Sequence, residues 1–137
     1  MGYSYKVLLM KTIEQIANKL IDALINKDIK ELNFLLNEGC KVHLAFQCSQ
    51  NINLNGKKQA LTCFEKIYNC TTKLEITKRK FVVSDPTHVL INFEGHSCLN
   101  LGEEEFDSVI FCEIINEKIT ELYAITPTLK IDIKGYW

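Results

Sequence analysis

Apolar residues recur along this chain with two different periods, and the change of period separates predicted helices from predicted strands. Thr12 and Gln15 have the spacing of a capping box, in which side chains satisfy free amides of a helix's first turn. The apolar set that follows has the three- and four-residue spacing of one helix face. Its members are Ile13, Ile16, Ala17, Leu20 and Leu24. The pattern therefore predicts a helix over residues 12–26.

Two further helices are predicted in the first half of the chain. Asp28 and Glu31 begin the second helix, and Gly39 can end it in the left-handed conformation. The third covers residues 57–70 and follows a polar loop over residues 49–56. Its apolar face consists of Ala60, Leu61, Phe64, Ile67 and Tyr68.

Between the second and third helices the period falls to two, which is the spacing of a strand with one buried face. This first strand covers residues 40–48. Its inner face carries Val42, Leu44 and Phe46, and its outer face carries Lys41, His43 and Gln47.

Four more strands are predicted after the third helix, joined by short polar turns. They cover residues 74–84, 88–100, 104–115 and 119–126. This order of elements predicts one α+β domain over residues 1–137, with a core of about residues 12–126. Its three helices, all from the N-terminal half, should cover one face of a strongly curved, mostly antiparallel sheet.

The composition narrows the class of protein. Sixteen basic and seventeen acidic residues leave a formal net charge of -1, and the basic run Lys78-Arg79-Lys80 is too short to neutralise a nucleic-acid backbone. The early apolar run over residues 7–10 is too short for a signal-peptide core or a membrane span. We therefore expect a cytoplasmic protein with no nucleic-acid partner and no membrane partner.

Six cysteines raise the question of disulfides or a bound metal. No two of them form a C-x-x-C pair and no export signal is evident, so free structural thiols are favoured over disulfides or a cysteine-ligated zinc. The chain also lacks the Gly-rich phosphate loop and the H-E-x-x-H motif, and we expect no cofactor and no metal site. The cysteines are Cys40, Cys48, Cys63, Cys70, Cys98 and Cys112.

Three segments of the chain carry a family resemblance. They are LIDALINKDIKELNFLLNEG for the helical pair, LNGKKQALTCFEKIY for the loop, glycine and third helix, and FDSVIFCEIINEKITELYAI for the last hairpin. In pattern and order they resemble the nuclear transport factor two-like superfamily, which includes SnoaL-like polyketide cyclases and ketosteroid isomerases. The resemblance implies a single SnoaL-like domain, a cone-shaped fold around an apolar pocket, and a homodimer formed through the outer face of the sheet.

The resemblance also assigns catalytic positions, because ketosteroid isomerases use an aspartate base, a tyrosine and a second aspartic acid. The base position falls at Leu44 and the tyrosine position near Leu20, and a leucine can neither take up nor donate a proton. The third position falls at or near Asp107, with Val109 as the alternative. If Asp107 faces the pocket, burial favours its protonated form and makes it an acid. A buried structural carboxyl and a solvent-facing one are the other two interpretations.

The stretch INFEGHSC places Glu94, His96 and Cys98 at every second position. Residues two apart on a strand lie about 6.6 Å apart and residues four apart about 13 Å, so the three cannot reach one zinc ion, whose ligands lie at about 2.0–2.3 Å. The pattern favours the outer face of the sheet or a dimer surface. A metal shared with another strand stays open, as does a pocket position if Gly95 marks a bulge that reverses the faces beyond it.

The inward apolar positions are the candidate ligand pocket of the implied cone, although such positions belong to the core by default. Tyr68 and Tyr123 are the stronger candidates, because a buried hydroxyl needs a hydrogen-bond partner from protein or ligand. The whole candidate set is Leu20, Leu24, Leu44, Phe46, Phe64, Tyr68, Phe93, Asp107, Phe111 and Tyr123.

Two functions are compatible with these patterns. The first is a SnoaL-like protein that holds an apolar small molecule and acts as an isomerase, cyclase or hydratase, with Asp107 and the tyrosines as polar anchors. The second is a non-catalytic homodimeric binding or protein-interaction module of the same fold. It is favoured by the leucines at the two isomerase positions and by an outer face that mixes Leu90 and Cys98 with polar residues. The sequence favours the pocket slightly and does not decide whether the protein is an enzyme.

Overall fold

Three helices and six strands follow one another in the computed structural model, which describes residues 2–46, 51–99 and 102–126. The helices are α1 (Gly2–Asn26), α2 (Ile29–Leu35) and α3 (Lys57–Cys70). The strands are β1 (Leu36–Phe46), β2 (Ile52–Asn55), β3 (Thr71–Asp85), β4 (His88–Leu99), β5 (Gly102–Ile115) and β6 (Lys118–Thr126).

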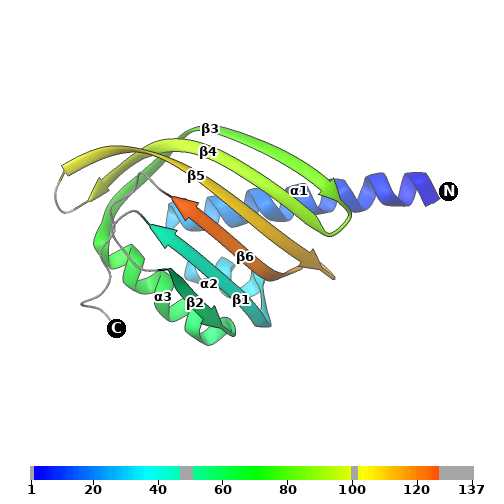
Figure 1. The fold of residues 1–137 in the computed structure, drawn as a ribbon, viewed down its shortest axis with the longest axis horizontal. Coiled ribbons are helices and arrows are strands. Elements are labelled where there is room, and N and C mark those ends of the chain that lie inside the picture. The colour runs from blue at the N-terminus through cyan, green and yellow to red at the C-terminus, as the bar shows by residue number, and fades with distance from the viewer. Residues whose placement is uncertain (1, 47–50, 100–101, 127–137) are drawn as a thin grey trace.

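The six strands form one sheet in the order β2-β1-β6-β5-β4-β3. Every pairing is antiparallel except that of β1 with β6, which is parallel. The sheet curves along its long strands, and the three helices lie on one side of it, with α1 against β3 and β4 and α3 against β1 (Figure 1). The predicted α+β class, with helices of the N-terminal half covering a curved sheet, is confirmed. No helix in the described ranges is long and apolar enough to cross a bilayer.

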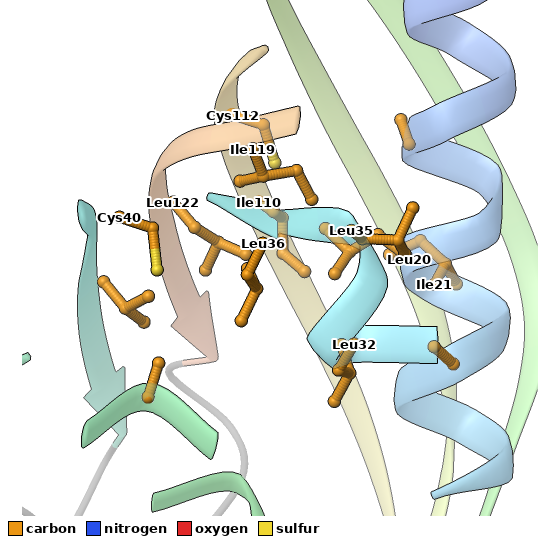
Figure 2. Packing of buried hydrophobic residues seen from close by; sticks show 14 of the residues in the cluster. Leu20, Ile21, Leu32, Leu35, Leu36, Cys40, Ile110, Cys112, Ile119 and Leu122 are labelled. Carbon is orange, nitrogen blue, oxygen red and sulfur yellow. The ribbon is translucent and has the colours of Figure 1, made fainter. Parts of the chain in front are cut away.

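The core lies between the helices and the facing side of the sheet. Its largest buried side chains are leucines and isoleucines exposed by less than 2%, and each contributes about 1.5–3 kcal/mol relative to an exposed position. Figure 2 shows the centre of this core, where side chains of α1, α2 and the sheet meet. The labelled residues are Leu20 and Ile21 of α1, Leu32 and Leu35 of α2, and Leu36, Cys40, Ile110, Cys112, Ile119 and Leu122 of the sheet.

Reciprocal hydrogen bonds join the end of α1 to the end of α3. The Tyr68 hydroxyl donates to the carbonyl oxygen of Ala23 at 3.3 Å, and the Lys27 ammonium donates to the carbonyl oxygen of Tyr68 at 2.9 Å. Asp28 then caps α2, because its Oδ1 accepts from the amide of Glu31 at 3.1 Å as the sequence predicts. These bonds hold α1 and the start of α2 against α3.

The helix boundaries differ from the prediction at two places. Helix α1 begins at Gly2 rather than at residue 12, because residues 3–11 contain neither glycine nor proline and Thr12 lies inside a continuous helix. Helix α2 ends at Leu35, and Leu36 already has the extended φ of -83° and ψ of 136°. Gly39 therefore lies within β1 and does not end a helix.

The predicted polar loop before α3 contains a strand. Residues Ile52–Asn55 form β2, which pairs with β1 and places Leu54 opposite Val42. Both side chains are buried. The segment is too short and too polar for its alternation to stand out in the sequence, and pairing with β1 supplies the hydrogen bonds that define it.

Gly95 lies at a close approach between the backbones of β3 and β4. It pairs with Ile76, but the next pair joins Glu94 to Lys78, so β3 carries one extra residue, Thr77. A Cβ atom added to Gly95 would lie 2.0 Å from the carbonyl oxygen of Glu75. The bulge therefore belongs to the partner strand, and β4 alternates without interruption through Gly95.

Gly95→Ala should lower the free energy of unfolding by about 3 kcal/mol, because the new methyl group has to displace the backbone of β3. Gly39→Ala is the matched control, since the nearest atom to its added Cβ is Asn37 Oδ1 at 3.7 Å. The control should change the free energy by less than about 0.5 kcal/mol. Urea unfolding followed by circular dichroism measures both, and equal losses in the two variants would contradict the close approach at Gly95.

Candidate functional site

The helix-facing members of the predicted pocket belong to the packed core. Leu20, Leu44, Phe64, Tyr68 and Phe93 are all exposed by 8% or less and form part of the continuous hydrophobic cluster. Leu24 is partly buried and packs against the same cluster, while the side chain of Phe46 lies outside the described part of the chain. These positions contribute to the core, which is the default role of inward apolar residues.

Tyr68 has its hydrogen-bond partner within the protein. Its hydroxyl donates to the carbonyl oxygen of Ala23, and burial, followed by the nearby charge of Asp28, raises its pKa well above the ordinary value. The hydroxyl therefore stays protonated and remains a donor to the backbone. This geometry assigns Tyr68 a role in joining α3 to α1.

The structure places Asp107, Phe111 and Tyr123 on the opposite face of the sheet, which corrects the inward assignment of Phe111 and Tyr123 and agrees with the solvent-facing interpretation of Asp107. All three side chains are exposed, Phe111 by 37% and Tyr123 by 40%. The residues of β5 that face the helices have the other parity, as Ser108 and Ile110 do. Apolar residues occupy both parities of β5, so hydrophobicity alone does not select the inner face, and a shift of one residue reverses every side chain.

Ser108 is the buried polar residue of β5 that the sequence analysis missed. It is exposed by 2%, and its hydroxyl donates to the carbonyl oxygen of Ile125 at 3.2 Å. Ser108 lies at every-second-residue spacing from Ile110, Cys112 and Ile114, and this spacing could have indicated that it shares their buried face. The helix-facing position next to Asp107 therefore carries a hydroxyl bonded to the backbone and no carboxyl group.

A bulge in β6 accounts for the orientation of Tyr123. Glu113 pairs with Glu121, but Ile114 pairs with Ile119, so Thr120 is the extra residue. The Thr120 hydroxyl lies 3.2 Å from the carbonyl oxygen of Glu113 and 2.7 Å from its Oε1. Ile119 and Leu122 consequently both face the core, and Tyr123 faces outward.

The outer face of the sheet carries a row of apolar and aromatic side chains that crosses five strands. The register places His43 beside Tyr123, Tyr123 beside Phe111, Phe111 beside Leu90 and Leu90 beside Val82. A second, shorter row of the same character lies next to it. We call the two rows together the outer band, which consists of His43, Ala45, Val82, Leu90, Val109, Phe111, Tyr123 and Ile125.

Ring contacts run along the outer band. The rings of His43 and Tyr123 stack with centroids 4.3 Å apart and an angle of 16° between their planes. Phe111 lies 6.5 Å from Tyr123 in a tilted arrangement, and the ring of His88 stacks on Phe111 at 5.5 Å. Nδ1 of His43 also lies 2.7 Å from Oδ1 of Asn53, which fixes the orientation of that ring. The band is therefore ordered by its own contacts although it is exposed.

Charged side chains flank the outer band on both sides. The first charged row follows the register across Lys41, Glu121, Glu113, His88 and Asp85. The second charged row crosses Lys78, Glu94 and Asp107. The hydroxyl of Tyr123 connects the band to the first row, because a hydrogen bond to Glu121 is the main cause that raises its pKa. An apolar centre with a polar rim is the usual anatomy of a protein interface.

His88 lies between two carboxylates at one end of the first charged row. Its Nδ1 is 3.0 Å from Oδ1 of Asp85, and its Nε2 is 3.3 Å from Oε2 of Glu113. Asp85 also accepts hydrogen bonds from the amide and the hydroxyl of Thr87, both at 2.8 Å. The Thr87 amide, and then the side chains of His88 and Thr87, lower the pKa of Asp85 to about 2.

Comparison with known proteins bears on the fold. No protein-family model matches the sequence, and no curated protein matches it. Solved structures do match. A protein from Xanthomonas campestris, proposed to be a polyketide cyclase, superposes with a TM-score of 0.75 at 9% identity, over 93% of this chain and 96% of its own.

Two further structures cover most of this chain. A phenazine biosynthesis-related protein from Pseudomonas aeruginosa matches with a TM-score of 0.73 at 16% identity, over 98% of each chain. A nuclear transport factor two-like protein from Anabaena variabilis matches with a TM-score of 0.72 at 16% identity, over 89% of each. The chain has the nuclear transport factor two-like fold. Structural similarity at such low sequence identity shows the fold of this chain and says nothing about its activity.

Within this nuclear transport factor two-like fold, a hollow of about 310 Å³ opens between α1 and β3. Glu14, Gln15, Asn18 and Phe81 line it. At its side, Arg79 donates to Oδ1 of Asn18 at 2.6 Å and to Oδ1 of Asp22 at 2.7 Å. No residue of the predicted pocket whose side chain is described lines this hollow.

The described cysteines and the INFEGHSC stretch show no metal chemistry. Cys40, Cys63 and Cys112 are free and buried, and burial raises the pKa of Cys63 to about 11 and that of Cys112 to about 12. Such thiols stay protonated and unreactive. The predicted outer-face position of Glu94 and His96 is confirmed. Over the described ranges, no group of three or more histidine, cysteine or acidic side chains can hold a metal. Cys48 and the side chains of Cys70 and Cys98 lie outside the described part.

Asp85→Asn should remove a pH-dependent contribution to stability. Because the folded protein lowers the pKa of Asp85 from 3.8 to about 2, the ionised carboxylate stabilises the fold above about pH 4, and this is lost as the pH falls toward about 2. The difference in Tm between the parent and Asp85→Asn should therefore shrink as the pH falls from about 4 toward about 2.

Thr87→Val is the graded control for this measurement, because it removes the hydroxyl donor and keeps the amide donor to Asp85. It should retain most of the pH dependence, since the amide is the main cause of the lowered pKa. A Tm difference between the parent and Asp85→Asn that does not change between about pH 6 and about pH 2 would contradict the assignment.

Proposed function

We propose that the protein acts as a homodimeric interaction module whose two copies pack through the outer band. The observation that carries this proposal is an ordered apolar row across five strands, bordered by charged rows, on the face opposite the helices (Figure 1). Val82 and Ile125 in this band are exposed by 47% and 50%. Large contiguous apolar patches are rare on the surfaces of monomeric proteins, and such a patch with a polar border usually marks an interaction site.

The arrangement of the helix side supports a binding role over isomerase chemistry. The positions that the family resemblance assigns to the base and the tyrosine are Leu44 and Leu20, which are exposed by 3% and 0%. Asp107 lies on the far face of the sheet, and the hydroxyl of Tyr68 is bonded to the backbone. The free buried thiols suit a reducing compartment, and we propose the cytoplasm as the location.

Tyr123→Glu should weaken the dimer by at least about 30-fold, because it places a charge at the centre of the proposed interface and removes an aromatic anchor. Phe34→Glu is the matched control, since Phe34 is a more exposed ring, at 61%, on α2 and outside the outer band. The control should leave the dimer unchanged. Sedimentation equilibrium of the three proteins measures the effect, and a parent protein that stays monomeric at tens of micromolar would refute the proposed function.

A small-molecule site in the hollow between α1 and β3 is the second candidate. The observation that favours it is the volume of about 310 Å³ beside the half-buried ring of Phe81, which reaches the lower end of the range for ligand pockets. Two of the structural neighbours are described as a proposed polyketide cyclase and a phenazine biosynthesis-related protein. Three of its four described lining residues are polar, so this candidate implies a small molecule with both polar and apolar parts, and cyclase, isomerase or hydratase chemistry.

Native mass spectrometry tests this second candidate. Freshly purified protein should carry an organic adduct that is lost on denaturation, and Phe81→Trp, which places a larger ring against the ligand, should abolish the adduct. Lys58→Ala on α3, away from the hollow, is the control and should retain it. An adduct that survives Phe81→Trp would place the ligand elsewhere.

A further inference from the structure

Both ring nitrogens of His88 face carboxylate oxygens. Nδ1 lies 3.0 Å and 3.1 Å from the two oxygens of Asp85, and Nε2 lies 3.3 Å from Oε2 of Glu113. A neutral imidazole carries a single N–H, so one of these contacts would oppose a nitrogen lone pair to a carboxylate oxygen. Nδ1 also lies 2.9 Å from the Thr87 hydroxyl, but that hydroxyl donates to Asp85. Only the protonated ring donates to both carboxylates. The geometry is therefore matched to the imidazolium form.

The charged groups around His88 come from four strands and are mainly acidic. Asp85 of β3 and Glu113 of β5 contact the ring directly. Glu121 of β6 and Lys41 of β1 follow in the same row, so the described part of the first charged row has one lysine for three carboxylates. Asp85 carries its charge throughout the range in which histidine changes its own, since its pKa is lowered further, from 3.8 to about 2. Protonation of His88 is thus the step that offsets excess negative charge along this row.

The position of His88 couples this charge to the outer band. Its ring stacks on Phe111 with centroids 5.5 Å apart and an angle of 20° between the planes. His88 is exposed by 28%, Asp85 by 47% and Glu113 by 36%, so a second copy packed on the band would cover a partly hydrated cluster. The opposing copy would also bring the second charged row, in which one lysine, Lys78, accompanies the two carboxylates Glu94 and Asp107. Association then concentrates carboxylates at the rim, where lost hydration strengthens their repulsion.

We infer that dimerisation through the outer band is coupled to the protonation of His88, and that a proton on this residue strengthens the dimer. This inference rests on the proposed homodimer and adds its regulation. Histidine changes its charge in the range of about pH 5 to 8, so association should tighten as the pH falls through that range. The partner is a second copy of this chain, and the ligand that regulates it is the proton.

His43 acts in the opposite direction and has to be separated from His88. It lies within the outer band, stacked on Tyr123, and its Nδ1 faces the amide oxygen of Asn53 rather than a carboxylate. A proton on His43 adds a charge to the apolar part of the interface, which weakens association. His96, near Glu75 and Glu105 in the register, lies beyond the second charged row. Variants of the individual histidines therefore isolate the contribution of His88.

The test is sedimentation equilibrium of the parent, His88→Gln and His43→Gln at about pH 8 and about pH 6 and at constant ionic strength. The quantity compared is the ratio of the dimer dissociation constant at the higher pH to that at the lower pH. This ratio should be about tenfold smaller in His88→Gln than in the parent, because each dimer contains two such sites. His43→Gln should keep the ratio of the parent or raise it.

Glu113→Gln is the second variant, because it keeps His88 and removes one carboxylate that the imidazolium contacts. It should lower the same ratio several-fold. If a thermal unfolding experiment shows that His88→Gln is not folded, Glu113→Gln alone tests the inference. A parent dimer whose ratio is unchanged in both variants would overturn the coupling and leave the homodimer standing. A parent that forms no dimer at either pH would overturn the proposed function and this inference with it.

Discussion

Burial of one face of the sheet against three helices determines where every other side chain of the sheet lies. Successive residues of a strand point to opposite faces, so burying Val89 and Ile91 places Leu90 on the other side. The same constraint in β5 buries Ile110 and Cys112 and turns Phe111 outward. The outer band is therefore a consequence of the core. A change that shifted the register by one residue would exchange the two surfaces.

The strand register shifts at several places in the curved sheet, and at two of these bulges a threonine is the extra residue. Thr77 is the extra residue of β3 and Thr120 is that of β6. In each case the hydroxyl donates to a carbonyl oxygen of the neighbouring strand, that of Glu94 at 3.2 Å and that of Glu113 at 3.2 Å. A bulge interrupts the backbone ladder, and these hydroxyls supply bonds across the gap. At these two positions a side chain thus replaces part of the interrupted backbone ladder.

The sequence predicted the features that depend on a strong period or on local chemistry. These include the order of the other elements, the C-terminal end of α1, both ends of α3, the cap at Asp28 and the outward position of Glu94 and His96. It could not predict β2, which exists through its pairing with β1. It also placed Phe111 and Tyr123 on the wrong face, because apolar residues occupy both parities of β5 and the bulge at Thr120 changes the parity of β6. The burial of each side chain in the folded structure decides which face Phe111 and Tyr123 occupy, and the sequence alone does not give that burial.

The division of polar groups between the two faces bears on how this fold is used. On the helix side, the hydroxyls of Tyr68 and Ser108 donate to backbone carbonyls, and the neighbouring side chains are core leucines and isoleucines. Groups that change charge near neutral pH gather instead on the outer face, where His88 touches two carboxylates and an aromatic ring of the band. A catalytic pocket needs titratable groups aimed at a shared enclosed space. Among the described residues, His88 and its two carboxylates lie on the outer face, where the second copy of the proposed homodimer would cover them.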